Sequence, residues 1–123
     1  AMFSLKVEST FSSAHNLRQY KGKCEALHGH NWKVEAVVSS ARLDKTGMVM
    51  DFSVIKSRLN AILAELDHAY LNKLAPFTRT NPTSENIARY IYGRLKRSIQ
   101  SLESVTVWEN ATSAAIYDER TKK

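Results

Sequence analysis

Two stretches of regular alternation restrict what this chain can fold into. Along residues 3–13 and again along residues 30–40, the side chains of one parity are mostly apolar. The apolar positions are Phe3, Leu5, Val7 and Phe11 in the first stretch and Trp32, Val34, Ala36 and Val38 in the second. A period of two residues is typical of strands that bury one face. We therefore predict two adjacent strands near the start of the chain, each with one apolar face.

Two later stretches have the spacing of helices. The apolar positions are Phe52, Ile55, Leu59, Ile62 and Leu66 within residues 51–66, and Ile87, Ile91, Leu95 and Ile99 within residues 85–100. This spacing places them on one side of each helix. We expect Asp51 or Ser53 to cap the first helix and Thr83 to cap the second, because short polar side chains accept hydrogen bonds from free N–H groups at helix starts.

The remaining segments complete the fold prediction. Residues 66–85 hold both prolines and lack a sustained period, so we expect a structured loop there. Residues 102–110 and 113–119 read as two short strands joined in a hairpin through Ala111 and Thr112. The order of two strands, two helices and two strands indicates an α+β fold with an antiparallel sheet.

Composition fits one domain spanning residues 1–123, with 43% hydrophobic residues. We interpret Ala1, which precedes Met2, as a residue left by expression cloning. The single cysteine cannot form an intramolecular disulfide, and the sequence shows no signal peptide and no apolar run of about 20 residues. We therefore expect a cytoplasmic protein with no membrane partner.

The net charge of +6 suits an anionic partner such as nucleic acid, an acidic surface or a phosphorylated metabolite. The basic residues are scattered, however, and the densest group is Arg94, Lys96 and Arg97 on the second predicted helix. We interpret this group as a solvated helix face and expect no nucleic-acid partner.

Three of the four histidines converge in the predicted sheet. His28 and His30 share the parity of the second strand's apolar face, and the parity of the first strand extends to His15. Side chains two residues apart on a strand point the same way, with Cβ atoms about 6 to 7 Å apart. Catalytic zinc sites use three protein ligands and an open fourth position. The three residues are therefore candidate zinc ligands, and the alternative is that they are hydrogen-bonded or exposed histidines.

Other residues carry chemistry with alternatives left open. Cys24 can be a buried small side chain, a fourth zinc ligand or a reactive thiol. Asp67 next to His68 can orient the imidazole for proton transfer, although adjacent pairs of this kind are also common surface features. Glu109 has the parity of an apolar strand face, where a carboxylate requires a partner.

Six motifs resemble, in order and spacing, one enzyme family. They are FSSAHNL, CEALHGHNW, GMVMDF, LDHAYLN, NPTSENIA and WEN, and they span nearly the whole chain. The sequence is similar to the 6-pyruvoyl-tetrahydropterin synthase and 6-carboxytetrahydropterin synthase (QueD) family. The resemblance implies the tunnelling fold: an antiparallel four-stranded sheet with two helices on one face, several copies of which close into an oligomeric β-barrel.

The resemblance also implies site residues. It makes His15, His28 and His30 the ligands of Zn²⁺, and Cys24 the catalytic thiol that works with Asp67 and His68 in proton transfer. It makes Glu109 the residue that anchors the pterin, with Thr83 and Glu85 as further pterin contacts. A carboxylate suits the guanidine-like edge of a pterin because it accepts two hydrogen bonds side by side.

The implied substrate is dihydroneopterin triphosphate, and the implied assembly is a homo-oligomer, a hexamer of two stacked trimeric rings. The three residues between Cys24 and the HGH triplet resemble the bacterial branch, which makes 6-carboxytetrahydropterin for queuosine. Glu25 resembles a carboxylate of members that release 6-hydroxymethyl-dihydropterin for folate synthesis, so we count it as a candidate substrate-binding residue or a solvated loop acid. Pyruvoyl-tetrahydropterin synthesis, a zinc-containing assembly module and a structural zinc site closed by Cys24 are the remaining alternatives.

Overall fold

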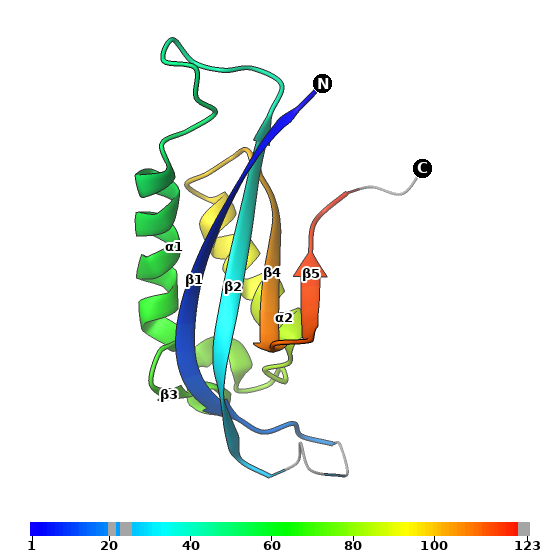
Figure 1. The fold of residues 1–123 in the computed structure, drawn as a ribbon. Coiled ribbons are helices and arrows are strands. Elements are labelled where there is room, and N and C mark those ends of the chain that lie inside the picture. Colours follow the sequence, from blue (N-terminus) through cyan, green and yellow to red (C-terminus); the bar gives the residue numbers. More distant parts are fainter. Residues whose placement is uncertain (20–21, 23–25, 121–123) are drawn as a thin grey trace.

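The structure, a computed structural model, describes residues 1–19, 22 and 26–120. Strands and helices follow the predicted order, with one short strand added (Figure 1). The elements are β1 (Phe3–His15), β2 (His28–Ser40), α1 (Phe52–Leu66), β3 (Ala69–Tyr70), α2 (Ser84–Lys96), β4 (Leu102–Asn110) and β5 (Ser113–Tyr117). The α+β class is therefore confirmed.

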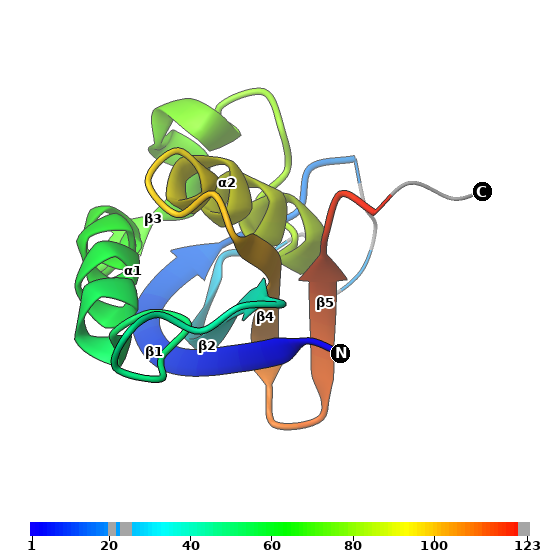
Figure 2. The ribbon, with the colours of Figure 1, turned by 90° about the horizontal axis from the view of Figure 1, so that it is seen from above.

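The strands form one sheet in the order β3-β1-β2-β4-β5. The four long strands β1, β2, β4 and β5 pair antiparallel, as predicted. The fifth strand, β3, has two residues and runs parallel to the end of β1. It lies in the segment that the sequence predicts as a loop, which also holds 3-10 helices at Leu71–Lys73 and Ala75–Phe77. The sheet of one chain is open, with β3 and β5 at its edges (Figure 2).

Both helices cover the same face of the curved sheet (Figure 2). Helix α1 packs against β1, and α2 packs against β4 and β5. The alternating residues of β2 form the centre of the core, because Trp32, Val34, Ala36 and Val38 are all fully buried. Phe11 of β1 stacks on Trp32, with ring centroids 5.8 Å apart. The other face of the sheet carries polar side chains such as Lys6 and Glu35.

The helix starts agree with the predicted caps. Asp51 accepts a hydrogen bond from the Ser53 N–H at 2.8 Å, so Asp51 is the cap and Ser53 is its partner. Thr83 accepts from the Asn86 N–H at 3.1 Å. Each cap satisfies an N–H group that has no partner inside the helix.

The end of α2 differs from the prediction. The helix ends at Lys96 and not at residue 100, yet Ile99 remains buried. The chain turns after the helix, and the Ile99 N–H still donates to the Leu95 carbonyl at 3.0 Å. A buried side chain in a terminal turn mimics helical periodicity, which explains the longer prediction. Among the described residues, no helix has both the length and the apolar composition needed to span a membrane.

We predict that Leu59→Ala lowers the free energy of unfolding by about 2 to 5 kcal/mol, because it leaves a cavity under the centre of α1. Leu59 is fully buried, whereas Ser57 on the same helix is exposed. Ser57→Ala is the matched control and should change stability by less than about 0.5 kcal/mol. Urea denaturation at equal protein concentration measures both. Equal stability of the two variants would contradict the packing of α1 on the sheet.

Candidate metal centre and adjacent pocket

The pairing of β1 with β2 brings three histidines together. In this antiparallel ladder His15 lies opposite His28, and Ser13 lies opposite His30. All three imidazoles contact one another on the face of the sheet that the helices cover, with ring centroids 4.6 to 5.2 Å apart. The fold therefore brings the three candidate ligands together.

Two main-chain carbonyls orient the rings. The Nδ1–H of His15 donates to the Pro82 carbonyl at 2.7 Å, and the Nδ1–H of His28 donates to the Ala26 carbonyl at 2.7 Å. A carbonyl can only accept, so the proton of each neutral ring is fixed on Nδ1. The two Nε2 atoms then face each other 3.0 Å apart as unprotonated acceptors. Carbonyl support of this kind is usual for histidines that bind metals.

His30 supplies an independent test of whether a cation fits here. Its Nε2 is buried, and among the described residues no atom forms a hydrogen bond with it. Oε1 of Glu109 lies 3.1 Å from this Nε2 without hydrogen-bond geometry. A buried polar atom without a partner is costly. A cation bound by the three Nε2 atoms would remove that cost, so the residues fit a metal.

Burial keeps two of these rings in the neutral form that metals need. Loss of solvation lowers the pKa of His15 from its ordinary value. Loss of solvation also lowers the pKa of His30, and the attraction of Glu109 opposes part of that change. Protonation would block the lone pair that a metal uses. Both rings are therefore suited to bind a divalent cation at neutral pH.

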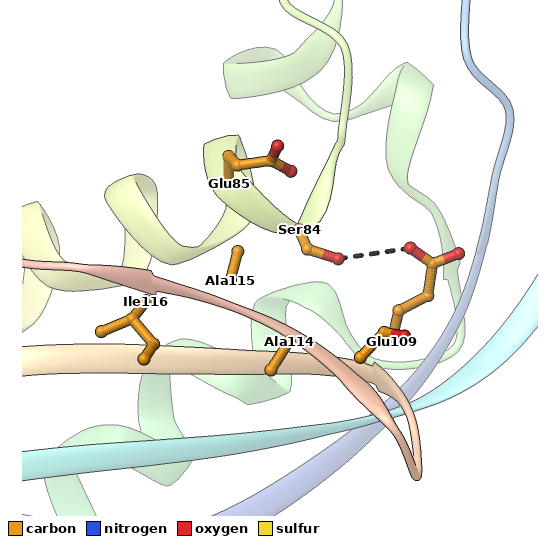
Figure 3. A pocket seen from close by; sticks show the side chains of 7 residues that line it. Ser84, Glu85, Glu109, Ala114, Ala115 and Ile116 are labelled. Atoms are coloured by element: carbon orange, nitrogen blue, oxygen red, sulfur yellow. Dashed lines mark hydrogen bonds between the residues drawn. The ribbon is translucent and has the colours of Figure 1, made fainter.

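Glu109 lies between the histidines and a pocket. One ligand atom from each of His15, His28, His30 and Glu109 lies within 4.8 Å of the others, so the four residues could hold a metal ion. The second oxygen of Glu109, Oε2, accepts a hydrogen bond from the Ser84 hydroxyl at 3.3 Å (Figure 3).

The pocket has a volume of about 410 Å³. Its walls are the first turn of α2, the end of β4 and residues 113–116 of β5 (Figure 3). Glu85 and Glu109, which the sequence singles out, both line it. Thr83 is not among the described lining residues, and its hydroxyl caps α2.

Two contributions to this site escape sequence reasoning. Ser84 lines the pocket and binds Glu109, and its position inside the NPTSEN motif was the available signal. The Pro82 carbonyl orients His15, but a main-chain atom leaves no signature in residue type.

The Asp67 and His68 pair belongs neither to the histidine cluster nor to the described lining of the pocket. Oδ2 of Asp67 accepts from the Nδ1–H of His68 at 2.8 Å, and Oδ1 accepts from the Ser12 N–H at 2.8 Å. The Ser12 and His68 hydrogen bonds lower the pKa of the Asp67 carboxyl. The His68 side chain is 83% exposed, and its backbone is left-handed with φ 50°. The pair is ordered and its imidazole faces away from the chain.

No described hydrogen bond or ion pair joins this pair to the histidine cluster. Asp67 and His68 precede β3 at one edge of the sheet, whereas Glu109 and the pocket lie at β4 and β5 toward the other edge. The adjacent residues Cys24 and Glu25 lie outside the described residues, so their roles stay predictions.

The profile of one protein family, described as 6-pyruvoyl tetrahydropterin synthase, matches residues 4–120. The chain belongs to this family. A Synechocystis relative named 6-carboxy-5,6,7,8-tetrahydropterin synthase is 43% identical, covering 94% of this chain and 93% of that protein. A Pyrococcus furiosus relative named dihydroneopterin monophosphate aldolase is 36% identical, covering 82% and 84%.

The fold is that of this synthase family as well. The Caenorhabditis elegans 6-pyruvoyl tetrahydropterin synthase structure superposes with a TM-score of 0.88 at 28% identity, covering 98% of this chain and 97% of the other.

The basic residues Arg94, Lys96 and Arg97, predicted to form a solvated helix face, partly take part in contacts that hold the fold together. Arg94 forms two hydrogen bonds of 2.8 Å with Glu65, and Lys96 donates to the Leu102 carbonyl.

We predict that His28→Ala takes up much less zinc than the wild type when both are supplied with zinc, because the change deletes one of three converging nitrogens. His68→Ala is the matched control and should keep its zinc, since His68 is exposed and outside the cluster. Metal analysis of both variants after extensive dialysis gives the stoichiometry. Full zinc occupancy in His28→Ala would remove His28 from the ligand set.

Proposed function

We propose that the chain is a zinc-dependent 6-carboxy-5,6,7,8-tetrahydropterin synthase that serves the synthesis of queuosine. It would convert 7,8-dihydroneopterin triphosphate and water into 6-carboxytetrahydropterin, acetaldehyde and triphosphate. The observation that carries this proposal is the convergence of His15, His28 and His30 beside a pocket bordered by Glu109. The name of the Synechocystis relative supports the choice of product.

Glu109 has the chemistry to bind the pterin ring. Its two carboxylate oxygens match the N3–H and 2-amino donors of the ring edge. The pocket volume of about 410 Å³ is within the range of small-molecule sites. Glu85 in the first turn of α2 and the hydroxyl of Ser84 are further contacts for the ring, and Thr83 supports them by capping the helix. The histidine cluster then lies next to the ring's side chain.

The proposed chemistry moves protons on the substrate's side chain. Zinc, when bound by the three histidines, supplies a Lewis acid that acidifies neighbouring C–H and O–H groups. Cys24, as thiolate, removes a proton, and His68 returns one. The Asp67 carboxylate holds the Nδ1–H of His68, which leaves Nε2 for proton transfer. These roles rest on the motif resemblance and on the ordered Asp67 and His68 pair.

The proposal places the working site between chains. Both sheet edges of the single chain are open, and unpaired edges require a cover. A homohexamer of two stacked rings would supply it and would bring His68 of one chain to the histidine cluster of another. The net charge of +6 suits the triphosphate of the substrate. We place the protein in the cytoplasm, on the sequence-based expectation.

A second activity has specific support. The Pyrococcus furiosus relative is named an aldolase, and Glu25 directly follows Cys24 in this chain. Cleavage of the pterin side chain to 6-hydroxymethyl-dihydropterin is therefore the alternative product, with Glu25 as the residue that supports it.

We predict that Cys24→Ala abolishes 6-carboxytetrahydropterin formation while zinc stays bound, because the thiol acts on a substrate proton. Incubation with dihydroneopterin triphosphate followed by mass analysis identifies the products, and metal analysis gives the zinc content. Zinc loss in this variant would instead support a structural site closed by Cys24. Release of 6-hydroxymethyl-dihydropterin by Cys24→Ala, and its loss in Glu25→Gln, would establish the second activity.

We also predict that inactive His28→Ala chains and inactive His68→Ala chains recover activity when mixed under conditions that exchange subunits. If each pocket joins a histidine cluster from one chain to His68 from another, random mixing leaves about one quarter of the pockets intact. Light scattering checks the assembly, and mass analysis checks the exchange. No recovery despite proven exchange would show that each chain uses its own His68.

A further inference from the structure

Glu109 is the one described residue that belongs both to the possible metal cluster and to the pocket lining. Its Oε1 lies 3.1 Å from the unpartnered Nε2 of His30, and its Oε2 accepts from Ser84 on the pocket side. The same carboxylate therefore has one oxygen next to His30 and one bound to Ser84; Figure 3 shows the contact with Ser84.

The donor set contains one more group than an open zinc site needs. Three neutral histidines and a carboxylate supply four ligands, which is the number that a closed tetrahedral site uses. A closed site has no position for a substrate. A pterin in the pocket requires the same carboxylate, because its ring edge presents two donors that need a paired acceptor. A carboxylate that gives Oε1 to a metal and Oε2 to Ser84 no longer presents both oxygens side by side to the ring edge, so the two uses compete.

We propose that Glu109 occupies the fourth coordination position while no substrate is bound, and leaves it to hold the pterin ring. The statement that Glu109 holds the pterin ring rests on the proposed function, whereas the statement that Glu109 binds the metal does not. Ser84 is the positioning residue, because its hydroxyl donates to Oε2 and so sets the orientation of the carboxylate. Binding of the ring would then open the metal for the substrate's side chain, and the open position would not exist without substrate.

The proposal has a thermodynamic consequence. If the metal and the pterin ring compete for Glu109, zinc weakens the binding of any pterin that lacks ligands of its own on the side chain. Linkage requires that such a pterin weaken zinc binding by the same factor. A carboxylate that only anchors the ring would produce neither effect.

The first experiment measures zinc affinity without any pterin, by competition with a chromophoric chelator. Glu109→Gln should bind zinc at least about tenfold more weakly than the wild type, the lower bound for losing a group that supports a zinc site. Glu103→Gln is the matched control, because Glu103 is an exposed acid on the same strand. Equal zinc affinity in wild type and Glu109→Gln would overturn the proposal, whatever reaction the protein catalyses.

The second experiment uses 6-methylpterin, whose side chain has no hydroxyl groups, and follows its fluorescence. The metal-free wild type should bind 6-methylpterin more tightly than the zinc-loaded wild type does. The ratio of these two pterin affinities should equal the ratio by which 6-methylpterin lowers the affinity for zinc. Equal or tighter binding in the presence of zinc would overturn the exchange. If 6-methylpterin binds neither the metal-free nor the zinc-loaded protein, both the exchange of Glu109 and the pterin site are overturned. The first experiment, which tests whether Glu109 binds zinc, would keep its result.

Discussion

The register between β1 and β2 is the constraint on which the site depends. A slip of one residue would move His28 and His30 to the opposite face of the sheet, because side chains alternate along a strand. The register is fixed by burial: Trp32 stacks on Phe11, and the residues of the same parity further along β2 are sealed from solvent by the helices. The apolar core therefore determines the positions of three polar rings at its end, and packing and chemistry cannot vary independently there.

Burying imidazoles at the end of the core costs free energy unless their N–H groups find partners, and other segments supply these partners. His15 is 1% exposed, and its Nδ1–H would lack a partner without the Pro82 carbonyl. The loop before α2 therefore orients a ring of the histidine cluster from outside the sheet, while Ser84, two residues later, donates to Glu109. Among the described residues, the Nε2 of His30 is buried without a hydrogen-bond partner. The fold leaves it facing Glu109 and its two neighbouring histidines, which is the arrangement that attracts a cation.

The parts that the sequence predicts are those governed by local rules. Alternation placed His15, His28 and His30 on one face, and capping chemistry located the starts of both helices at Asp51 and Thr83. The parts it misses depend on contacts between distant segments. β3 is too short to show a period, and Ile99 is buried by a turn that resembles one more helical turn. Nothing in the adjacency of Asp67 and His68 indicates that the sheet separates them from Glu109.

That separation makes the Asp67 and His68 pair informative. A left-handed backbone at a residue other than glycine costs about 1 kcal/mol. At His68 the Ser12 main chain holds it, because the Ser12 carbonyl accepts from the His68 N–H and the Ser12 N–H donates to Oδ1 of Asp67. A surface histidine without a role needs no such arrangement. Asp67 fixes the Nδ1 of this ring, and the His68 side chain stays exposed although β1, the strand that carries His15, is the direct neighbour of β3. In the proposed hexamer, a second chain would cover the open edges of the sheet and would also contact the exposed imidazole, so the two features would have the same explanation.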